Sequence, residues 1–132
     1  MERIKEYFGN DHYARLAGIE LLAVSEGRAS ARMALGPQHL NSLKTVHGGA
    51  IFTLADFAFA AAANSHGTVA VALNANITFM KASRAGELLA EAREVSRNHR
   101  IGTYVVEVKD AAGDLVAQFQ GLAYRKKEAL AI

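Results

Sequence analysis

The chain has 132 residues, of which 51% are hydrophobic and 21% charged, a composition that excludes a disordered chain and suffices for one domain with its own core. Its formal net charge is only +2, with positive and negative side chains interspersed, so no nucleic-acid partner is indicated. The absence of cysteine excludes disulfides, thiolate nucleophiles and cysteine-based metal sites.

The first 18 residues predict a short helical segment. Ile4, Tyr7 and Phe8 recur at helical spacing, and Asn10 or Asp11 can cap a second short helix. The opening sequence, MERIKEYFGN, is charged and does not resemble a secretory signal. We therefore expect a cytoplasmic protein with no membrane partner.

Two strands follow, at 19–25 and 28–35, and form a predicted hairpin. In the second strand, polar and small apolar residues alternate with the period of a half-buried strand. Gly36-Pro37 ends this strand, and a loop leads into the most apolar stretch of the chain.

That stretch, residues 41–64, reads NSLKTVHGGAIFTLADFAFAAAAN and predicts one helix that begins near His47. The helix is apolar on nearly every face, so other structure must surround it. At about 1.5 Å per residue it would be roughly 27 Å long, enough to cross a small domain.

Two features of this helix suggest chemistry. Gly48 and Gly49 stand at its expected N-terminus, where free amides can bind an anion or a developing oxyanion. Asp56 is the only charged residue between Lys44 and Lys81. The residues alone leave two other interpretations open: an ordinary turn before a helix, and a salt-bridged carboxylate in the core.

The spacing of these two features predicts an oligomer. Gly48 and Asp56 lie about 12 Å apart along one helix, whereas contacts to one reacting carbonyl are about 3 Å long. If both act on one substrate, they belong to different chains. Two antiparallel helices in a two-fold homodimer would bring each Asp56 to the other chain's Gly48.

After the helix the chain predicts four strands joined by short turns, which favours antiparallel pairing. These strands span 69–79, 87–97, 103–109 and 115–124. Residues 126–132 are predicted to be a short tail, with the basic run Arg125-Lys126-Lys127 exposed to solvent. The prediction is a single α+β domain over residues 1–132, in which a curved antiparallel sheet surrounds one long helix.

Four short motifs follow one another along the chain. His39-x-Asn41, His47-Gly48-Gly49, Leu54-Ala55-Asp56 and the run from Asn76 to Met80 (NITFM) together resemble the PaaI-type hotdog-fold acyl-CoA thioesterases. The resemblance extends from about Leu16 to Arg125. It implies the hotdog fold, which is a central helix in an antiparallel sheet, assembled as a dimer or a dimer of dimers.

The resemblance also implies roles for four residues in acyl-CoA hydrolysis. Asp56 would act as general base or nucleophile, and the Gly48 amide of the neighbouring subunit would polarise the thioester carbonyl. Asn41 and His47 would position the thioester and water. Such enzymes typically need neither metal nor cofactor, and the coenzyme A they bind is part of the substrate.

On the substrate side, the resemblance draws attention to two turns and one strand. Arginines in the turn matching the family's coenzyme A contact, and cations in the preceding turn, suit phosphates. Many members carry a water-holding Ser or Thr where this chain has Ala72, and Asn74 is a candidate substitute on the same face. The candidate substrate-binding residues are Asn74, Met80, Lys81, Arg84, Arg97 and Arg100.

Three other functions fit the sequence less well. A non-catalytic acyl-CoA-binding module is the main alternative, and the loss of Ser or Thr at position 72 favours it mildly, whereas Asp56 argues against it. A hotdog hydratase or dehydratase would pair a histidine with a carboxylate in another arrangement, which this sequence does not show. A metal site from His39, His47 and Asp56 fits no helical histidine motif. The sequence does not determine which acyl group is bound. Phe57 and Phe59 could stack on an aryl acyl group or belong to the core.

Overall fold

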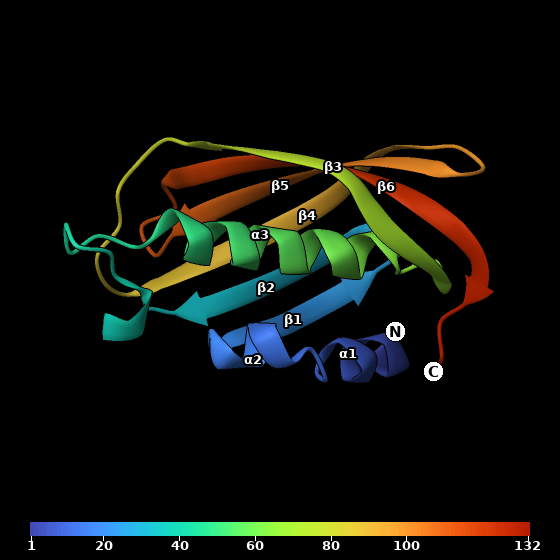
Figure 1. The fold of residues 1–132 in the computed structure, drawn as a ribbon, viewed down its shortest axis with the longest axis horizontal. Helices are drawn as coiled ribbons and strands as arrows, with labels where there is room; N and C mark the ends of the chain where they lie inside the picture. Colours follow the sequence, from blue (N-terminus) through green and yellow to red (C-terminus); the bar gives the residue numbers. More distant parts are fainter.

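The computed structural model describes residues 1–132 and shows one antiparallel sheet curved around one long helix (Figure 1). The helices are α1 (Glu2–Phe8), α2 (His12–Leu16) and α3 (Gly48–Ala63), with a 3-10 turn at Pro37–His39. The strands are β1 (Ile19–Ser25), β2 (Arg28–Ala34), β3 (Thr68–Phe79), β4 (Glu87–Arg97), β5 (Ile101–Asp110) and β6 (Leu115–Ala129). Their order is β1-β2-β4-β5-β6-β3, with every neighbouring pair antiparallel. This confirms the predicted α+β hotdog architecture.

Helix α3 is the centre of the core and contacts all six strands. Leu54, Ala55 and Ala58 are fully buried, as expected for a helix that is apolar on most of its surface. Phe57 and Phe59 are also buried, so they belong to the core and do not form a stacking surface for an aryl group. Phe57 packs against Phe8, and Phe59 packs against Tyr104 and Phe119.

The two N-terminal helices lie beside β1, close to α3 (Figure 1). Phe8 of α1 meets Phe57 of α3 edge to face, with ring centroids 6.0 Å apart. Asp11 caps α2, because its Oδ1 accepts a hydrogen bond from the Ala14 amide at 3.0 Å. The predicted capping role of Asp11 is confirmed, and it places the Asp11 carboxylate near α3. None of the helices is long and apolar enough to cross a membrane.

The last strand is longer than the sequence predicts. β6 continues to Ala129, which pairs with Thr68 at the start of β3. Leu130 is buried, and its amide donates to Gly67 O at 2.9 Å. The prediction of a tail from residue 126 was therefore wrong: Arg125, Lys126 and Lys127 are held in a strand by cross-strand pairing and by the anchor at Leu130.

β3 forms one edge of the sheet, and its outer side has no partner strand in this chain. The strand carries large exposed apolar residues, among them Leu73 at 57% and Phe79 at 51% exposure. A long, apolar, unpaired edge is the usual template for pairing with another chain.

The packing of α3 on the sheet depends on one glycine. A Cβ atom built on Gly121 of β6 would lie 2.6 Å from Phe59 Cε1, closer than side chains approach one another. We expect Gly121→Ala to lower the free energy of unfolding by about 1–3 kcal/mol, the usual cost of overpacking a core. Urea titration measures this loss. Gln120→Ala is the control, because Gln120 is the exposed neighbour on the same strand, and an equal loss there would contradict the packing argument.

Candidate functional site

The start of α3 is shaped by its own histidine. His47 is the N-cap residue, and its Nδ1 accepts the Gly49 amide hydrogen at 2.8 Å. This contact requires the hydrogen of the neutral ring to be on Nε2, which leaves Nε2–H as a donor. The first backbone bonds of the helix run from Ala50 and Ile51 to His47 O, so the Gly48 amide has no acceptor within the helix. A free amide therefore stands at the positive end of the helix.

His39 holds this terminus in place. The buried His39 ring accepts from the Gly36 amide at Nδ1 (3.0 Å), and its Nε2 donates to Ala17 O (2.6 Å). Its backbone O accepts from His47 N at 2.7 Å. Because both ring nitrogens are occupied, His39 connects the end of α2 to the start of α3 and has no free nitrogen for a metal.

Asn41 organises the loop before α3. Its Oδ1 accepts from the amides of Leu43 (2.9 Å) and Thr45 (3.2 Å) and from the Thr45 hydroxyl (3.2 Å). Lys44 closes the turn in the left-handed conformation, with φ of 63°. The Asn41 oxygen is therefore committed to the loop, and only its Nδ2 group is free to contact a ligand.

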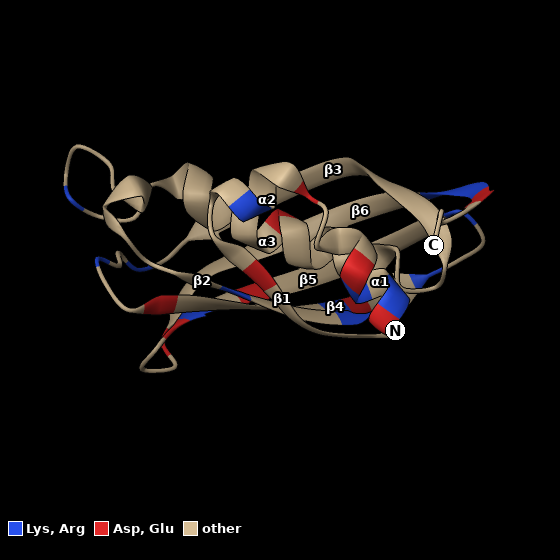
Figure 2. Cartoon of the chain, turned by 90° about the horizontal axis from the view of Figure 1, so that it is seen from below, with Lys and Arg blue, Asp and Glu red and all other residues tan.

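Asp56 is the only charged side chain of α3, and the rest of the helix carries no charge (Figure 2). It is half-buried, and no side chain or backbone amide donates a hydrogen bond to it, so the interpretation as a salt-bridged core carboxylate is wrong. Burial raises the pKa of the Asp56 carboxyl above its ordinary value, and the negative charge of Asp11 raises it further. A partly desolvated carboxylate without a partner is available as a base or nucleophile.

Asp56 belongs to the one stripe of α3 that the sheet leaves uncovered. The partly or fully exposed residues on this stripe follow helical spacing: Gly49, Phe52, Thr53, Asp56 and Ala60. A cavity of about 400 Å³ opens beside the first half of the stripe, between α2 and α3. It is lined by Tyr13, Leu16, Ala17, Gln38, His39, Leu40, His47, Gly49, Ala50 and Thr53.

The structure separates two residues that the sequence placed on one face. Ala72 pairs with the buried Ala123 and therefore points toward α3, whereas Asn74 pairs with Leu122. A β-bulge between Ala72 and Asn74 shifts the register by one residue and turns Asn74 to the outer face of the sheet. The prediction that Ala72 and Asn74 lie on the same face was therefore wrong.

The predicted phosphate-binding cations form two separate groups. Lys81 and Arg84 precede β4, while Arg97 and Arg100 stand at its other end, roughly 35 Å away at 3.3 Å per residue. Lys81 Nζ also donates to Asp110 (2.7 Å) and Asp114 (2.6 Å), which neutralises it. The two turns are neighbours in sequence but not in one folded chain, and basic residues accordingly appear at both ends of the sheet (Figure 2). Met80 is exposed at the end of β3.

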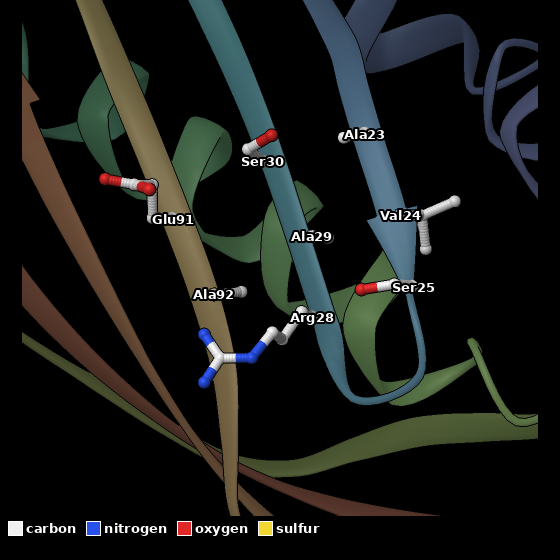
Figure 3. A pocket seen from close by; sticks show the side chains of 8 residues that line it. All are labelled: Ala23, Val24, Ser25, Arg28, Ala29, Ser30, Glu91 and Ala92. Atoms are coloured by element: carbon white, nitrogen blue, oxygen red, sulfur yellow. The ribbon is translucent and has the colours of Figure 1, made fainter.

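Another hollow, of about 210 Å³, lies on the face of the sheet away from α3 (Figure 3). Small residues of β1, β2 and β4 form it, with Arg28 and Glu91 at its margin. The sheet separates it from Asp56 and from the start of α3, so it is not part of the candidate site.

Comparison with known proteins identifies the family of the chain. Residues 43–117 match the family model described as Thioesterase superfamily. The chain is 36% identical over 119 residues to the acyl-coenzyme A thioesterase PaaI of Escherichia coli, covering 89% of this chain and 85% of that protein. The chain belongs to the thioesterase superfamily. It is a PaaI-type hotdog-fold thioester hydrolase.

Two further matches support the assignment to this family. A candidate esterase of Archaeoglobus fulgidus is 45% identical over 130 residues, covering 97% of this chain and 84% of that protein. The solved structure of Escherichia coli PaaI superposes with a TM-score of 0.90 at 35% identity, covering 94% of this chain and 91% of that chain. The hotdog thioesterase fold therefore extends over almost the whole chain.

The sequence did not predict how two residues beside the candidate site are placed. Asp11 was predicted only as a helix cap, and nothing in the local pattern could show that it lies near Asp56. His39 was predicted only as part of a motif and as one of three possible metal ligands, not as a buried ring with a partner at both nitrogens. Both placements depend on the packing of α2 beside α3.

The electrostatic effect of Asp11 on Asp56 can be measured. In Asp11→Asn the helix cap is retained, because asparagine caps as well as aspartate, but the negative charge is lost. We expect the pKa of Asp56 to fall, so the acid limb of the pH profile for thioester hydrolysis should move to lower pH. Glu6→Gln, which removes an acidic group elsewhere in the N-terminal segment, should leave the profile in place. An acid limb that does not move in Asp11→Asn would contradict the coupling.

Proposed function

We propose that this thioesterase hydrolyses acyl-CoA, with Asp56 of one protomer and the Gly48 amide of its partner acting on the same thioester. The observation that supports this best is the Asp56 carboxylate itself, which is half-buried on an apolar helix and has no partner. Leaving a carboxylate in that position is costly unless it is used.

A two-fold dimer would bring the two groups together. The unpaired edge of β3 and the exposed stripe of α3 lie on the same side of the chain as the Gly48 amide, because Phe79 at the end of β3 packs over Gly48. Antiparallel pairing of two β3 edges makes the two α3 helices antiparallel. A two-fold axis near Phe52, midway between Gly48 and Asp56, then places each Asp56 beside the partner's Gly48.

The chemistry follows from these groups. Asp56 either removes a proton from the attacking water or attacks the thioester carbonyl carbon itself. In both routes the carbonyl oxygen becomes an oxyanion that accepts a hydrogen bond from the Gly48 amide at the positive end of α3. The C–S bond then breaks, and the departing thiolate takes up a proton to give the CoA thiol. In the base route this proton comes from the protonated Asp56, and the free acid forms directly. In the nucleophile route an anhydride remains on Asp56, and a water molecule must hydrolyse it to release the free acid and restore the carboxylate. The Nε2–H of His47 and the Nδ2 group of Asn41 would orient the thioester and the water.

The cavity between α2 and α3 is the proposed place for the acyl group. It adjoins Gly49 and Thr53 and includes the side chains of Tyr13, Leu16 and Leu40. A short, medium or aryl acyl group suits its size and mixed lining. One solved relative, 36% identical with a TM-score of 0.83, is the phenylacetic acid degradation protein PaaI of Thermus thermophilus. Phenylacetyl-CoA is therefore the first substrate to assay.

The role of Asp56 is tested by Asp56→Asn, which keeps the size of the side chain but removes the base. We expect kcat to fall about a hundredfold or more, the usual scale for loss of a general base. Stability should not fall at pH 7. A carboxyl whose pKa is higher in the folded than in the unfolded protein stabilises the folded state at pH values below the unfolded pKa. This stabilisation is lost as the pH rises through the pKa of the folded state.

Turnover and melting temperature are measured on the same Asp56→Asn sample. A folded variant with wild-type turnover would contradict the mechanism, and would leave Asp56 without a catalytic role.

The shared site is tested by mixing two inactive variants. Gly48→Pro removes the amide hydrogen at the first helical position, where proline fits, and His47 already has the extended backbone that precedes proline. Mixed with Asp56→Asn, it forms heterodimers in which one site keeps both groups. Random mixing should restore about a quarter of wild-type activity, because half of the dimers regain one of two sites.

Gly48→Ala is the control for bulk in this experiment, since it keeps the amide hydrogen but also approaches Phe79, at 3.2 Å. It should retain far more activity than Gly48→Pro. If the mixture stays inactive although heterodimers form, Asp56 and Gly48 do not act across the interface.

A further inference from the structure

Helix α2 holds two of its largest apolar side chains outside the core. Tyr13 is 68% exposed and Leu16 is 80% exposed, whereas Ala14 of the same helix is buried. Tyr13, Leu16 and Ala17 follow helical spacing, and all three line the cavity between α2 and α3. Apolar side chains gathered around a concave opening are typical of a site that an apolar ligand group fills.

The two helical walls of this cavity differ in bulk. On the α3 side the lining residues are Gly49, Ala50 and Thr53, which are all small. On the α2 side Tyr13 and Leu16 are large. Helix α3 is fixed in the core by contacts with all six strands, whereas α2 contacts β1 and α3. The space left for a ligand therefore depends mainly on the side chains of α2 and on where α2 lies.

The position of α2 depends on contacts outside the helix. With five residues, α2 is too short to be stable by itself. Asp11 caps its start, and the buried side chain of Ala14 anchors its middle. At its end, Ala17 O accepts a hydrogen bond from His39 Nε2 at 2.6 Å. Gly18, with φ of 77°, then turns the chain into β1.

His39 connects the end of α2 to the start of α3. Its Nδ1 accepts from the Gly36 amide at 3.0 Å, and its backbone O accepts from His47 N at 2.7 Å. The buried residue that holds Ala17 thus also holds the helix terminus that carries the Gly48 amide. A change at one ring nitrogen of His39 can therefore release α2 and leave the start of α3 in place.

We propose that α2 is the wall that limits the length of the acyl group, and that His39 is the positioning residue that fixes this wall relative to α3. The inference rests on the proposed function as an acyl-CoA hydrolase, and it adds the feature that decides which acyl groups are accepted. An acyl group whose carbonyl oxygen is at the Gly48 amide would extend along α3 into the cavity and end against Tyr13 and Leu16.

The bulk of the wall is tested with Leu16→Ala and Leu16→Phe, by measuring kcat/KM for butanoyl-CoA and decanoyl-CoA. Leu16→Ala should raise the ratio of decanoyl to butanoyl activity about tenfold, because even one methylene group in an apolar pocket changes kcat/KM on that scale. Leu16→Phe should lower the ratio. Val95→Ala is the control, since Val95 is exposed on β4 and does not line the cavity. Unchanged ratios in both Leu16 variants would overturn the proposal.

The role of His39 is tested with two variants that each keep one of its ring contacts. His39→Gln retains a donor toward Ala17 O, and His39→Asn retains an acceptor for the Gly36 amide. Both should lower the melting temperature, as loss of a buried hydrogen bond does. Only His39→Asn should lose the discrimination between butanoyl-CoA and decanoyl-CoA, whereas His39→Gln should keep it. The same selectivity in both variants would mean that His39 is merely structural and would overturn its positioning role.

A binding experiment separates this inference from the proposed hydrolysis. The chain has no tryptophan, so Tyr13→Trp introduces a single fluorescent reporter in the wall, and Val95→Trp introduces one outside it. Titration with S-hexyl-CoA, a thioether that cannot be hydrolysed, should shift the emission of Tyr13→Trp to shorter wavelength and leave that of Val95→Trp unchanged. If this shift occurs but the wild type hydrolyses no acyl-CoA, the wall stands and the proposed function fails. If the wild type hydrolyses acyl-CoA but Tyr13→Trp shows no shift, the wall is overturned and the hydrolase function remains.

Discussion

The burial of α3 is the constraint on which the rest of this structure depends. A helix of sixteen residues that is apolar on most faces cannot stay in water, and the sheet curves so that all six strands contact it. The small side chains of the helix and Gly121 of β6 permit this close approach, since Phe59 occupies the space that a side chain on Gly121 would need. The hotdog shape is thus a consequence of packing a sheet around a single apolar cylinder.

The burial is incomplete in one place, and the proposed catalytic carboxylate lies there. One stripe of α3 is uncovered, Asp56 lies on it, and the unpaired β3 edge is on the same side of the chain. A charged residue there opposes folding because burial disfavours its ionised form, as its raised pKa shows. The same desolvation makes the carboxylate more basic, so the feature that weakens the fold suits a general base.

The two ends of α3 are fixed by different polar contacts. At the first end, His47 caps the helix and His39 holds the preceding loop. At the other end, Asn64 pairs with the backbone of Ala70, and the Glu94 carboxylate accepts from Tyr104 at 2.7 Å and contacts His66 at 2.9 Å. Burial raises the pKa of the Glu94 carboxyl, whereas the contacts with Tyr104, His66 and Arg97 lower it. The contacts have the larger effect, so this pKa lies below its ordinary value. A helix held at both ends keeps the Gly48 amide and Asp56 in fixed positions relative to the sheet.

The sequence by itself determined the elements, the central helix and the catalytic candidates. Hydrophobic periodicity is a local property, so the strands and α3 were predictable within a few residues, and the motif from His39 to Asp56 indicated the thioesterase family. Three features required the tertiary structure. The bulge that separates Ala72 from Asn74 arises from cross-strand register, which alternation along one strand cannot reveal. The nearness of Asp11 to Asp56 depends on how α2 packs beside α3. The basic run at Arg125 resembled a solvated tail in the sequence. In the structure it pairs with β3 and contacts the β4–β5 turn, so it lines a cleft together with the arginines of that turn. Charges that are distant in sequence come together only through tertiary contacts.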